Sequence, residues 1–234
     1  MYSASSKHDQ VLQTFTVVTP DYDKVNRAMT LGRHAKWCAE VARLAAVPPG
    51  GRLLDIATGT GPIAFAARKR YPTAEITACD FSESMIEEAS SRPGAEGITW
   101  EIADANALPY EDDSFDAITH GYLLRNVDDV EGVLREQYRV LKPGGRIAIL
   151  ETCPPKGILK LPVSIGVKII VPTLGQVLAK NRASYKYLAQ STLDFMTPDA
   201  VAQVMKHIGF VSVGWQRRFL TTHMLLHAAK PTTS

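Results

Sequence analysis

The chain has 234 residues, of which 45% are hydrophobic and 21% are charged, so it has enough apolar material for a buried core and is not a low-complexity disordered protein. Its 26 basic and 24 acidic residues give a net charge of +2, which is too balanced to make nucleic acid the default partner. The three cysteines are far apart and form no CxxC pair, so they predict neither a disulfide framework nor a zinc site and favour the reducing cytoplasm.

The first two thirds of the chain alternate between helices and strands. Residues 1–50 read as helical up to the breaker Pro48-Pro49-Gly50-Gly51. Short apolar runs predict strands at 52–56, 75–79, 98–102, 114–120 and 146–150. Helices are predicted at 61–71, at 82–91 with Ser82 as cap, and from Asp128 or Asp129 to Leu141, where Pro143-Gly144-Gly145 follows. This alternation predicts βαβ units and a mainly parallel sheet with helices on both faces.

The alternation of strands and helices ends after Glu151. Residues 152–197 mix prolines and glycines with apolar residues. A helix is predicted to begin at Thr197 and Pro198 and to end at His207. Two antiparallel strands are predicted at the sheet edge, at 211–216 and 222–229. We find no linker and predict one domain over 1–234, with a helical lid at 1–50 and an insertion at 152–197 over the substrate pocket.

The longest apolar stretch, 158–179, contains two lysines and two prolines, so we predict no membrane-spanning segment. Two interpretations stay open for it: a mobile wall over a hydrophobic substrate tail, and a helical insertion packed on the sheet edge. The N-terminus lacks the apolar block of a secretory signal. These features predict a cytoplasmic protein and leave open loose contact with a membrane surface.

A loop of small residues follows the first predicted strand, in the run Asp55-Ile56-Ala57-Thr58-Gly59-Thr60-Gly61. Small residues let the backbone turn tightly and approach a ligand, and the next helix directs its free N–H groups at that ligand. Asp55, Asp80 and Asp104 end three successive strands, at the edge where open α/β sheets bind ligands. Asp80 can accept both hydroxyls of a ribose, and Asp104 can meet an adenine amino group.

Two cofactor classes fit this loop. Gly59-x-Gly61-x-x-Ala64 also satisfies the nicotinamide dinucleotide fingerprint, and Tyr138 with Lys142 forms a YxxxK pair that some dehydrogenases use. The charge of Asp55 opposes a pyrophosphate and favours a cation, and S-adenosylmethionine carries a positive sulfonium and an amine. The acids therefore favour S-adenosylmethionine, with S-adenosylhomocysteine as its product.

Four ordered motifs carry a resemblance over most of the chain, from about Phe15 to Lys230. The sequence resembles the class I S-adenosylmethionine-dependent methyltransferases, and among them the C-methyltransferases of menaquinone and ubiquinone biosynthesis. The matching stretches are Tyr22-Asp23-x-Val25-Asn26 with Met29-Thr30, His34 and Trp37; Leu124-Arg125-Asn126-Val127; Arg139 to Gly145 and on to Glu151; and Tyr185-Lys186-Tyr187-Leu188-x-x-Ser191 with Gly209-Phe210. Departures occur at Val25, Thr30, Pro62 and Cys153, and 154–179 matches loosely.

The resemblance implies a Rossmann-like methyltransferase fold with a seven-stranded, mostly parallel sheet whose last strand is antiparallel and whose helices lie on both faces. The residues expected to bind the cofactor are Asp55, Ala57, Thr58, Gly59, Gly61, Asp80, Phe81, Met85, Asp104 and Ala105. The implied reaction is C-methylation of a quinone precursor, demethylmenaquinol to menaquinol above all. The alternatives are C-, O- or N-methylation of another small aromatic or secondary-metabolite acceptor, an adenosine-binding protein without catalysis, and an oxidoreductase.

Methylation of an aromatic carbon beside a phenol needs a stabilised phenolate and an acceptor for the ring proton. Arginine stays protonated, so Arg125 is predicted to stabilise the anion, and Asn126 to orient it or to hold the substrate oxygen. His120 and Tyr22 are predicted proton acceptors, directly or through water. His223 and His227 lack an obvious third ligand, so no metal is expected. The expected partner is a small hydrophobic acceptor, and homodimer formation is left open.

Overall fold

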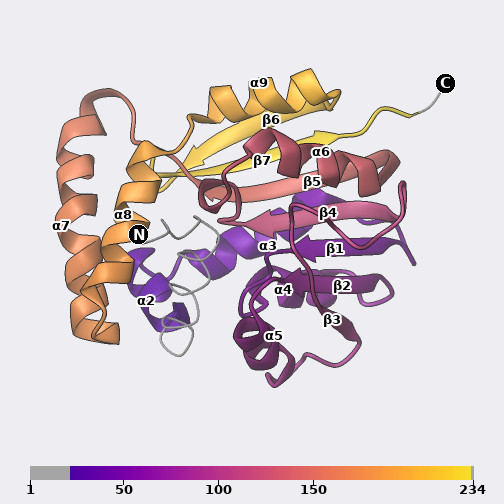
Figure 1. Cartoon of the computed structure of the whole chain (residues 1–234), viewed down its shortest axis with the longest axis horizontal. Helices are drawn as coiled ribbons and strands as arrows, with labels where there is room; N and C mark the ends of the chain where they lie inside the picture. The colour runs from indigo at the N-terminus through magenta and orange to yellow at the C-terminus, as the bar shows by residue number, and fades with distance from the viewer. Residues whose placement is uncertain (1–21, 233–234) are drawn as a thin grey trace, which may run out of the picture.

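The structure is a computed structural model, and it describes residues 22–232. One seven-stranded sheet forms its centre, with helices on both faces and a pair of long helices along one end (Figure 1). The part of the predicted lid that falls on 1–21 lies outside the described residues.

The sheet has the strand order β3-β2-β1-β4-β5-β7-β6. Strands β1 to β5 are mutually parallel, and β7 runs antiparallel to both of its neighbours. The strands are β1 (Arg52–Ile56), β2 (Glu75–Asp80), β3 (Ile98–Ile102), β4 (Phe115–Gly121), β5 (Leu141–Thr152), β6 (Val211–Arg218) and β7 (His223–Ala229). The strand order reverses between β1 and β4, which run parallel to each other, so the carboxyl ends of β1, β2 and β4 face a crevice where such sheets bind ligands.

Helices cover each face of the sheet and enclose two main cores. Along β5, Ile147 and Ile149 belong to the core under α6 and α9, whereas Ala148 and Leu150 belong to the core under α3 and α4, as the alternation of a strand requires. The helices and 3₁₀ turns are α2 (Tyr22–Met29), α3 (His34–Ala45), α4 (Pro62–Arg70), α5 (Glu83–Ser90), η2 (Leu124–Asn126), α6 (Val130–Val140), η3 (Gly157–Leu159), α7 (Lys160–Ala179), α8 (Arg182–Asp194) and α9 (Pro198–Ile208). The fold class predicted from the sequence is confirmed.

The caps of three helices were predicted from single residues. Asp129 accepts a hydrogen bond from the Gly132 amide at 2.8 Å, and Thr197 accepts one from the Ala200 amide at 3.3 Å, so both cap their helices as expected. Ser82 precedes α5, but its hydroxyl contacts the Ser84 hydroxyl at 3.0 Å and caps no amide. Ser82 therefore stands at the predicted N-cap position, but the predicted hydrogen bond between its side chain and an amide of the helix is absent.

The predicted fifth strand was too short. Strand β5 begins directly after α6, at Leu141, and passes through Pro143-Gly144-Gly145 before it reaches the predicted 146–150. Its pairing with β4 shifts between Phe115 and Ala117, and Gly144, at φ +78°, donates its amide to the Lys230 carbonyl at 3.0 Å. The glycines therefore form an irregularity within the strand rather than a loop before it. At the other side of the sheet, β6 is the edge strand and β7 lies inside.

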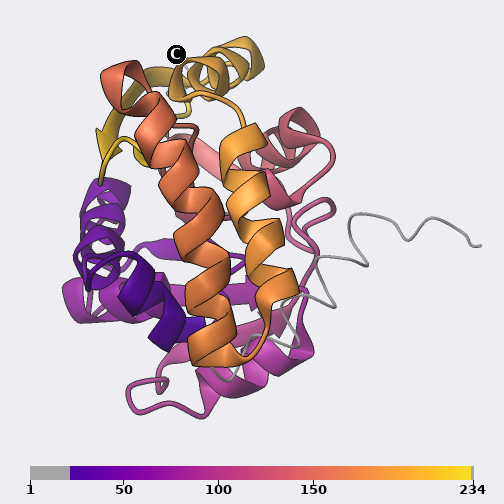
Figure 2. The same ribbon diagram turned by 90° about the vertical axis from the view of Figure 1, so that its left-hand side faces the viewer.

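The insertion before the last helix is an antiparallel pair of helices, α7 and α8, which Figure 2 shows in front of the sheet's end. The helices approach most closely where Gly175 faces the Tyr185 ring, since any larger residue at 175 would collide with that ring. Val25 of α2 and Tyr185 and Leu188 of α8 form a third, small core together with Val171. The predicted insertion is therefore helical, and α2 and the helix pair cover the carboxyl end of the sheet together.

Candidate functional site

The loop after β1 has the backbone that the sequence predicts. Ala57, Gly59 and Gly61 all have positive φ, at +49°, +55° and +83°. A Cβ atom at Gly61 would lie 2.8 Å from the rings of Phe65 and Trp100, so this position needs glycine for space as well as for conformation. Gly61 also precedes α4, whose first residue is Pro62. The loop thereby places the N-terminus of α4 at the crevice.

Two buried carboxylates hold this loop in place. Asp55 accepts hydrogen bonds from the hydroxyls of Thr58 at 2.6 Å and Thr119 at 2.7 Å. Burial raises the pKa of Asp55 to about 6, although these hydroxyls act in the opposite direction. Asp80 accepts from the amides of Gly59 at 2.9 Å and Ser82 at 3.0 Å, and burial raises its pKa. The Phe81 amide is a third donor to this carboxylate, so at least one lone pair of Asp80 is left that a ribose hydroxyl can occupy.

An acid-lined pocket opens at the ends of β1, β2 and β3. Its lining contains three carboxylates and no basic side chain. The full lining is Ala57, Phe81, Ala103, Asp104, Ala105, Asn106, Leu123, Asn126, Val127, Asp128 and Asp129. Apolar walls with negative charge fit a ligand that joins a flat ring to a cationic centre, which is the chemistry of S-adenosylmethionine.

The structure places the ten predicted cofactor residues in two groups. Ala57, Phe81, Asp104 and Ala105 line the acid-lined pocket. Asp55, Thr58, Gly59, Gly61, Asp80 and Met85 lie outside its lining, and of these Asp55, Thr58, Asp80 and Met85 are buried. Asp104 accepts from the amide and the side chain of Asn106, at 2.9 and 2.7 Å. Hydrogen bonds of Thr58 with Asp55 and of Gly59 with Asp80 hold the loop, and direct contact with a cofactor stays a prediction for all ten.

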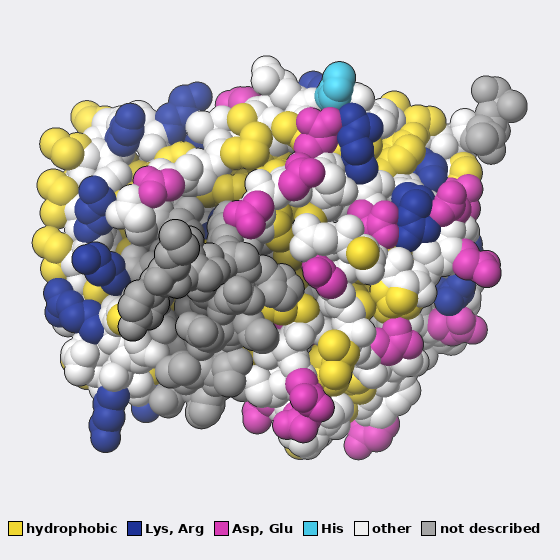
Figure 3. All heavy atoms as spheres, viewed as in Figure 1, with side chains coloured by type: hydrophobic (Ala, Val, Ile, Leu, Met, Phe, Trp, Pro, Cys, Tyr) yellow, Lys and Arg dark blue, Asp and Glu magenta, His cyan; other side chains and the backbone are white. Residues whose placement is uncertain are grey.

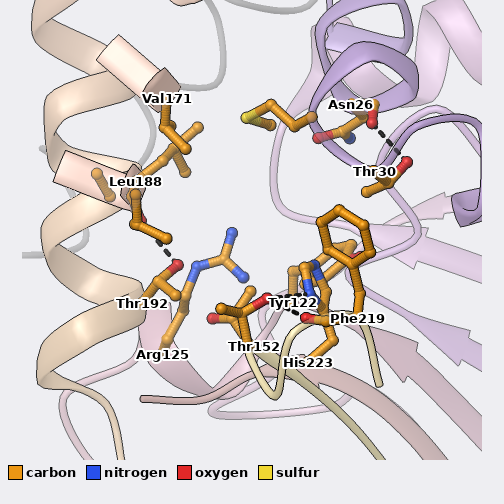
Figure 4. Close-up of a pocket in the computed structure, with 14 residues that line it drawn as sticks. Asn26, Thr30, Tyr122, Arg125, Thr152, Val171, Leu188, Thr192, Phe219 and His223 are labelled. Atoms are coloured by element: carbon orange, nitrogen blue, oxygen red, sulfur yellow. Dashed lines mark hydrogen bonds between the residues drawn. The ribbon is translucent and has the colours of Figure 1, made fainter. Parts of the chain in front are cut away.

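A second pocket, the apolar pocket, lies between α2, the α7–α8 pair and β7 (Figure 4). Its walls include Met29, Val167, Val171, Leu188 and Phe219. Most of the surface that the pocket exposes is apolar, as expected for a site that binds a hydrophobic ligand, and polar side chains contribute the smaller part. These side chains are Asn26, Thr30, Tyr122, Arg125, Thr152, Thr192, Thr222 and His223.

Arg125 supplies the positive charge of the apolar pocket. Its guanidinium points into the cavity (Figure 4), donates to the Glu151 carboxylate at 2.9 Å and lies 5.0 Å from the centre of the Tyr122 ring. Arg125 is 7% exposed and Glu151 is fully buried, and the Arg125 Nε finds no partner among the described residues. Glu151 therefore holds the Arg125 guanidinium in place. Some of the N–H donors of this guanidinium remain for a ligand.

The two pockets meet at η2. Arg125 lines the apolar pocket, and the next residue, Asn126, lines the acid-lined pocket. Asn126 donates its side-chain amide to the Tyr122 carbonyl at 2.7 Å, and its oxygen accepts from the Tyr187 hydroxyl at 3.3 Å. The short helix that the sequence marked as Leu124-Arg125-Asn126-Val127 is thus the wall across which two ligands would face each other.

Of the two predicted proton acceptors, only His120 has a side chain that the structure describes. His120 is fully buried in β4 and lines neither pocket. Burial lowers its pKa to about 3, and the Gln137 amide of α6 acts in the opposite direction. Tyr22 begins α2, but its side chain lies outside what the structure describes. The position of His120 favours a packing role, and its role in proton transfer stays an untested prediction.

Several residues at this site were not singled out from the sequence. Glu151 and Tyr187 stood only inside longer motifs, yet they hold Arg125 and Asn126. His223 was considered only as a metal ligand. It lines the apolar pocket, contacts the Thr222 hydroxyl through Nδ1 at 2.9 Å, and has its pKa lowered to about 3 by burial and by the charge of Arg125. Within residues 22–232 no group of three metal-ligating side chains occurs.

Tyr138 and Lys142, which form the YxxxK pair of the dehydrogenase alternative, contact different residues. Lys142 binds the Asp116 carboxylate at 2.9 Å, and the Tyr138 ring packs edge-on against Phe210 with ring centres 4.9 Å apart. Neither residue lines the acid-lined pocket or the apolar pocket. The structure therefore explains both residues by packing and surface charge, and the oxidoreductase alternative loses its catalytic pair.

This fold, with a glycine loop after β1 and an acid-lined pocket at the switch point, defines a Rossmann-like methyltransferase. Known structures with the same fold include a methyltransferase of Haloferax volcanii in complex with the Trm112 activator, with TM-score 0.68 and 16% identity over 93% of this chain and 97% of that one. Another is phosphoethanolamine N-methyltransferase 2 of Haemonchus contortus bound to S-adenosyl-L-methionine, with TM-score 0.64 and 18% identity over 86% of this chain and 53% of that one.

The chain belongs to the ubiE/COQ5 methyltransferase family, whose model matches residues 3–229. It is 43% identical to the ubiquinone/menaquinone biosynthesis C-methyltransferase UbiE of Desulfotalea psychrophila, over 93% of this chain and 89% of that one. It is 38% identical to the demethylmenaquinone methyltransferase of Thermus thermophilus, over 84% and 90% of the two chains. The chain is therefore an S-adenosylmethionine-dependent methyltransferase, and the resemblance inferred from its motifs is confirmed.

Proposed function

We propose that this protein transfers a methyl group from S-adenosylmethionine to a ring carbon of a reduced quinone precursor, demethylmenaquinol above all. The relatives named for that activity support this proposal, since the match extends over both halves of the fold. The observation that carries it is the placement of Arg125 and Asn126 on the wall between an acid-lined and an apolar pocket.

The acid-lined pocket suits the methyl donor. When bound, S-adenosylmethionine supplies an electrophilic methyl group on a cationic sulfur. Asp104, Asp128 and Asp129 provide negative charge for its cationic groups, and Asp80 keeps a lone pair for a ribose hydroxyl beside the amides that it binds. Ala57 and Ala105 are small enough to let a flat ring lie between them and Phe81.

The apolar pocket suits an aromatic acceptor with an apolar tail. We propose that the Arg125 guanidinium stabilises the phenolate, because the anion directs electron density to the neighbouring ring carbon. Asn126 orients the acceptor or holds its oxygen. Holding the carbon and the methyl group at attacking distance can contribute about 7–11 kcal/mol to catalysis. Tyr22 or water would take the ring proton, and His120 remains a less favoured acceptor because it lines neither pocket.

The acceptor is proposed to be hydrophobic and the enzyme to be a cytoplasmic protein that contacts the membrane surface where such quinones reside. Val167, Val171 and Leu188 give the pocket an apolar wall on its α7–α8 side, and Met29 adds to it from α2. An aliphatic tail that lies along this wall would be removed from water there.

The deciding experiment is a turnover assay with mass-spectrometric detection. Purified protein receives S-adenosylmethionine and a reduced, short-chain demethylmenaquinone, and we expect a product heavier by one methylene whose methyl group is on the ring carbon. Thermal stabilisation by S-adenosylhomocysteine is measured in parallel. Stabilisation without a product would overturn the quinone proposal while keeping the methyltransferase, and would turn attention to another aromatic acceptor.

A further inference from the structure

The outward side of α7 is the most apolar exposed surface of the described chain. Seven of the eleven exposed large hydrophobic side chains in residues 22–232 lie between Ile158 and Val177. Leu161, Ile165 and Ile169 are spaced by four residues and are 70%, 50% and 60% exposed, so they form one stripe along the helix. We call the set Ile158, Leu161, Ile165, Ile169, Ile170 and Val177 the α7 outer face.

The opposite side of α7 packs inside the protein. Val167 and Val171 line the apolar pocket, and Gly175 contacts the Tyr185 ring of α8. By length and composition alone, Gly157–Ala179 is apolar enough to cross a membrane, with a mean hydropathy of 1.6. Its inner side is committed to α8 and to the pocket, so a spanning role would remove a pocket wall. The exposed half of this helix is the part that needs an explanation.

Positive charge surrounds the α7 outer face. Residues 152–193 contain six of the 26 basic residues and none of the 24 acidic ones. All six are exposed, and none forms an ion pair with another described residue. They are Lys156, Lys160, Lys168, Lys180, Arg182 and Lys186. Figure 3 shows blue and yellow side chains together at the end occupied by α7, whereas on the rest of that face the charged side chains are more often magenta than blue.

We propose that the α7 outer face docks on the surface of a bilayer that contains anionic phospholipids. Apolar side chains on one helix face with lysines beside them are the pattern of helices that lie in a membrane interface. The isoleucines and leucines enter the acyl boundary, and the lysines contact the lipid phosphates. A second copy of this chain fits the same face less well, because two such faces would bring twelve positive charges together without a carboxylate between them.

Docking there explains why the pocket and the exposed face share one helix. Val167 and Val171 face the pocket from the side of α7 opposite to Ile165 and Ile169. A lipid-like acceptor would then pass from the bilayer to the pocket around a single helix rather than through water. This consequence rests on the proposed function, whereas vesicle binding by itself does not.

The test is sedimentation of the full-length protein with vesicles of phosphatidylcholine alone or mixed with phosphatidylglycerol. We expect binding to the mixed vesicles that weakens as salt is raised. The double variant Ile165→Gln/Ile169→Gln removes two apolar side chains outside the pocket and should bind about tenfold less or more weakly still. The double variant Lys160→Gln/Lys168→Gln should lose the preference for phosphatidylglycerol. Val211→Gln, which changes an exposed apolar residue on β6, is the matched control and should bind as the wild type does.

Turnover separates docking from the proposed reaction. The isoleucine variant should methylate a short-chain acceptor in solution as fast as the wild type does, and a long-chain acceptor in vesicles more slowly. Equal binding of the wild type and the isoleucine variant would overturn docking at α7, as would binding that ignores phosphatidylglycerol. A dimer in light scattering that the isoleucine variant dissociates would identify the face as a contact between two copies instead. Vesicle binding without turnover would overturn the acceptor and leave docking in place.

Discussion

The two pockets on either side of η2 are built in different ways. The acid-lined pocket is formed by loops at the ends of β1, β2 and β3, whose backbone is held by Asp55 and Asp80 in the centre of the sheet. The apolar pocket is walled by α2, α7 and α8, which are added to the end of the sheet, and α7 leaves half of its surface exposed. The acid-lined pocket is therefore set by loops at the strand ends, and the apolar pocket by packing between helices.

The largest effect is expected where the two pockets meet. Arg125→Gln removes the guanidinium and leaves the buried Glu151 carboxylate without its ion-pair partner, a change that costs about 3–5 kcal/mol of stability. We expect turnover to fall by about a hundredfold or more, while S-adenosylhomocysteine binding persists, because Arg125 lies outside the acid-lined pocket. Urea denaturation, calorimetric binding and turnover measure the three quantities.

A second variant at this position separates loss of catalysis from loss of folding. Arg125→Lys keeps the charge beside Glu151 and loses the planar donor set, so it should fold better than Arg125→Gln and still turn over slowly. Wild-type turnover in either variant would show that the guanidinium has no part in the reaction.

The donor side should be sensitive to a single methyl group. Gly61→Ala places a Cβ atom against the Phe65 and Trp100 rings at φ +83°, and we expect a loss of about 2–4 kcal/mol together with weaker S-adenosylhomocysteine binding. Gly94→Ala is the matched control, because φ is +89° there and no atom lies within 4 Å. The control should lose only about 1 kcal/mol and bind normally. Thermal and urea unfolding measure the loss of stability in both variants. If Gly61→Ala lost no more stability than Gly94→Ala, the Phe65 and Trp100 rings would have moved aside to accommodate the added methyl group.

Asp55 should make stability depend on pH. Its pKa is about 6 in the folded protein and 3.8 as the ordinary value, so the unfolded chain releases this proton more readily than the folded one. Its contribution is complete below about pH 4 and is lost as pH rises through about 6, by up to about 3 kcal/mol. His120 and His223, with pKa values lowered to about 3, act in the opposite direction because stability falls as pH drops below 6.5.

The difference between the wild type and Asp55→Asn therefore isolates the carboxyl group. Urea unfolding of both proteins from pH 4 to pH 7 should show the wild type losing stability relative to the variant as pH rises. A constant difference across this range would contradict a raised pKa at Asp55.

The smallest effect is expected on the acceptor side, from Tyr187→Phe. The variant removes the hydroxyl that donates to Asn126 at 3.3 Å and keeps the ring in its packing with α2 and α7. A neutral hydrogen bond contributes about 0.5–1.5 kcal/mol, so kcat should fall about two- to tenfold while S-adenosylhomocysteine affinity is unchanged. Gln190→Ala changes an exposed position on the same helix and is the control. An equal effect of both variants on kcat would show that α8 acts as a whole and not through this bond.

The sequence by itself determined the alternating architecture and the conformation of the loop after β1. The strands lie at or near their predicted positions because each buried strand is a short apolar run with breakers beside it. The loop from Asp55 to Gly61 was predictable because its positive φ angles need small residues, and such a need is visible in single letters. The motif at Leu124–Asn126 likewise marked the place where the pockets meet.

Only the tertiary structure decided which side chains face which pocket. His120 and Arg125 are five residues apart, yet one packs under α6 and the other points into the apolar pocket, because the chain leaves β4 and turns into η2 between them. Glu151, Tyr187 and His223 reach the site from β5, α8 and β7, and no local pattern encodes contacts between residues so far apart in the chain. A helical insertion was one of two interpretations left open for 158–179, and only the packed structure, with Pro172 inside α7 and Gly175 against the Tyr185 ring, decided for it.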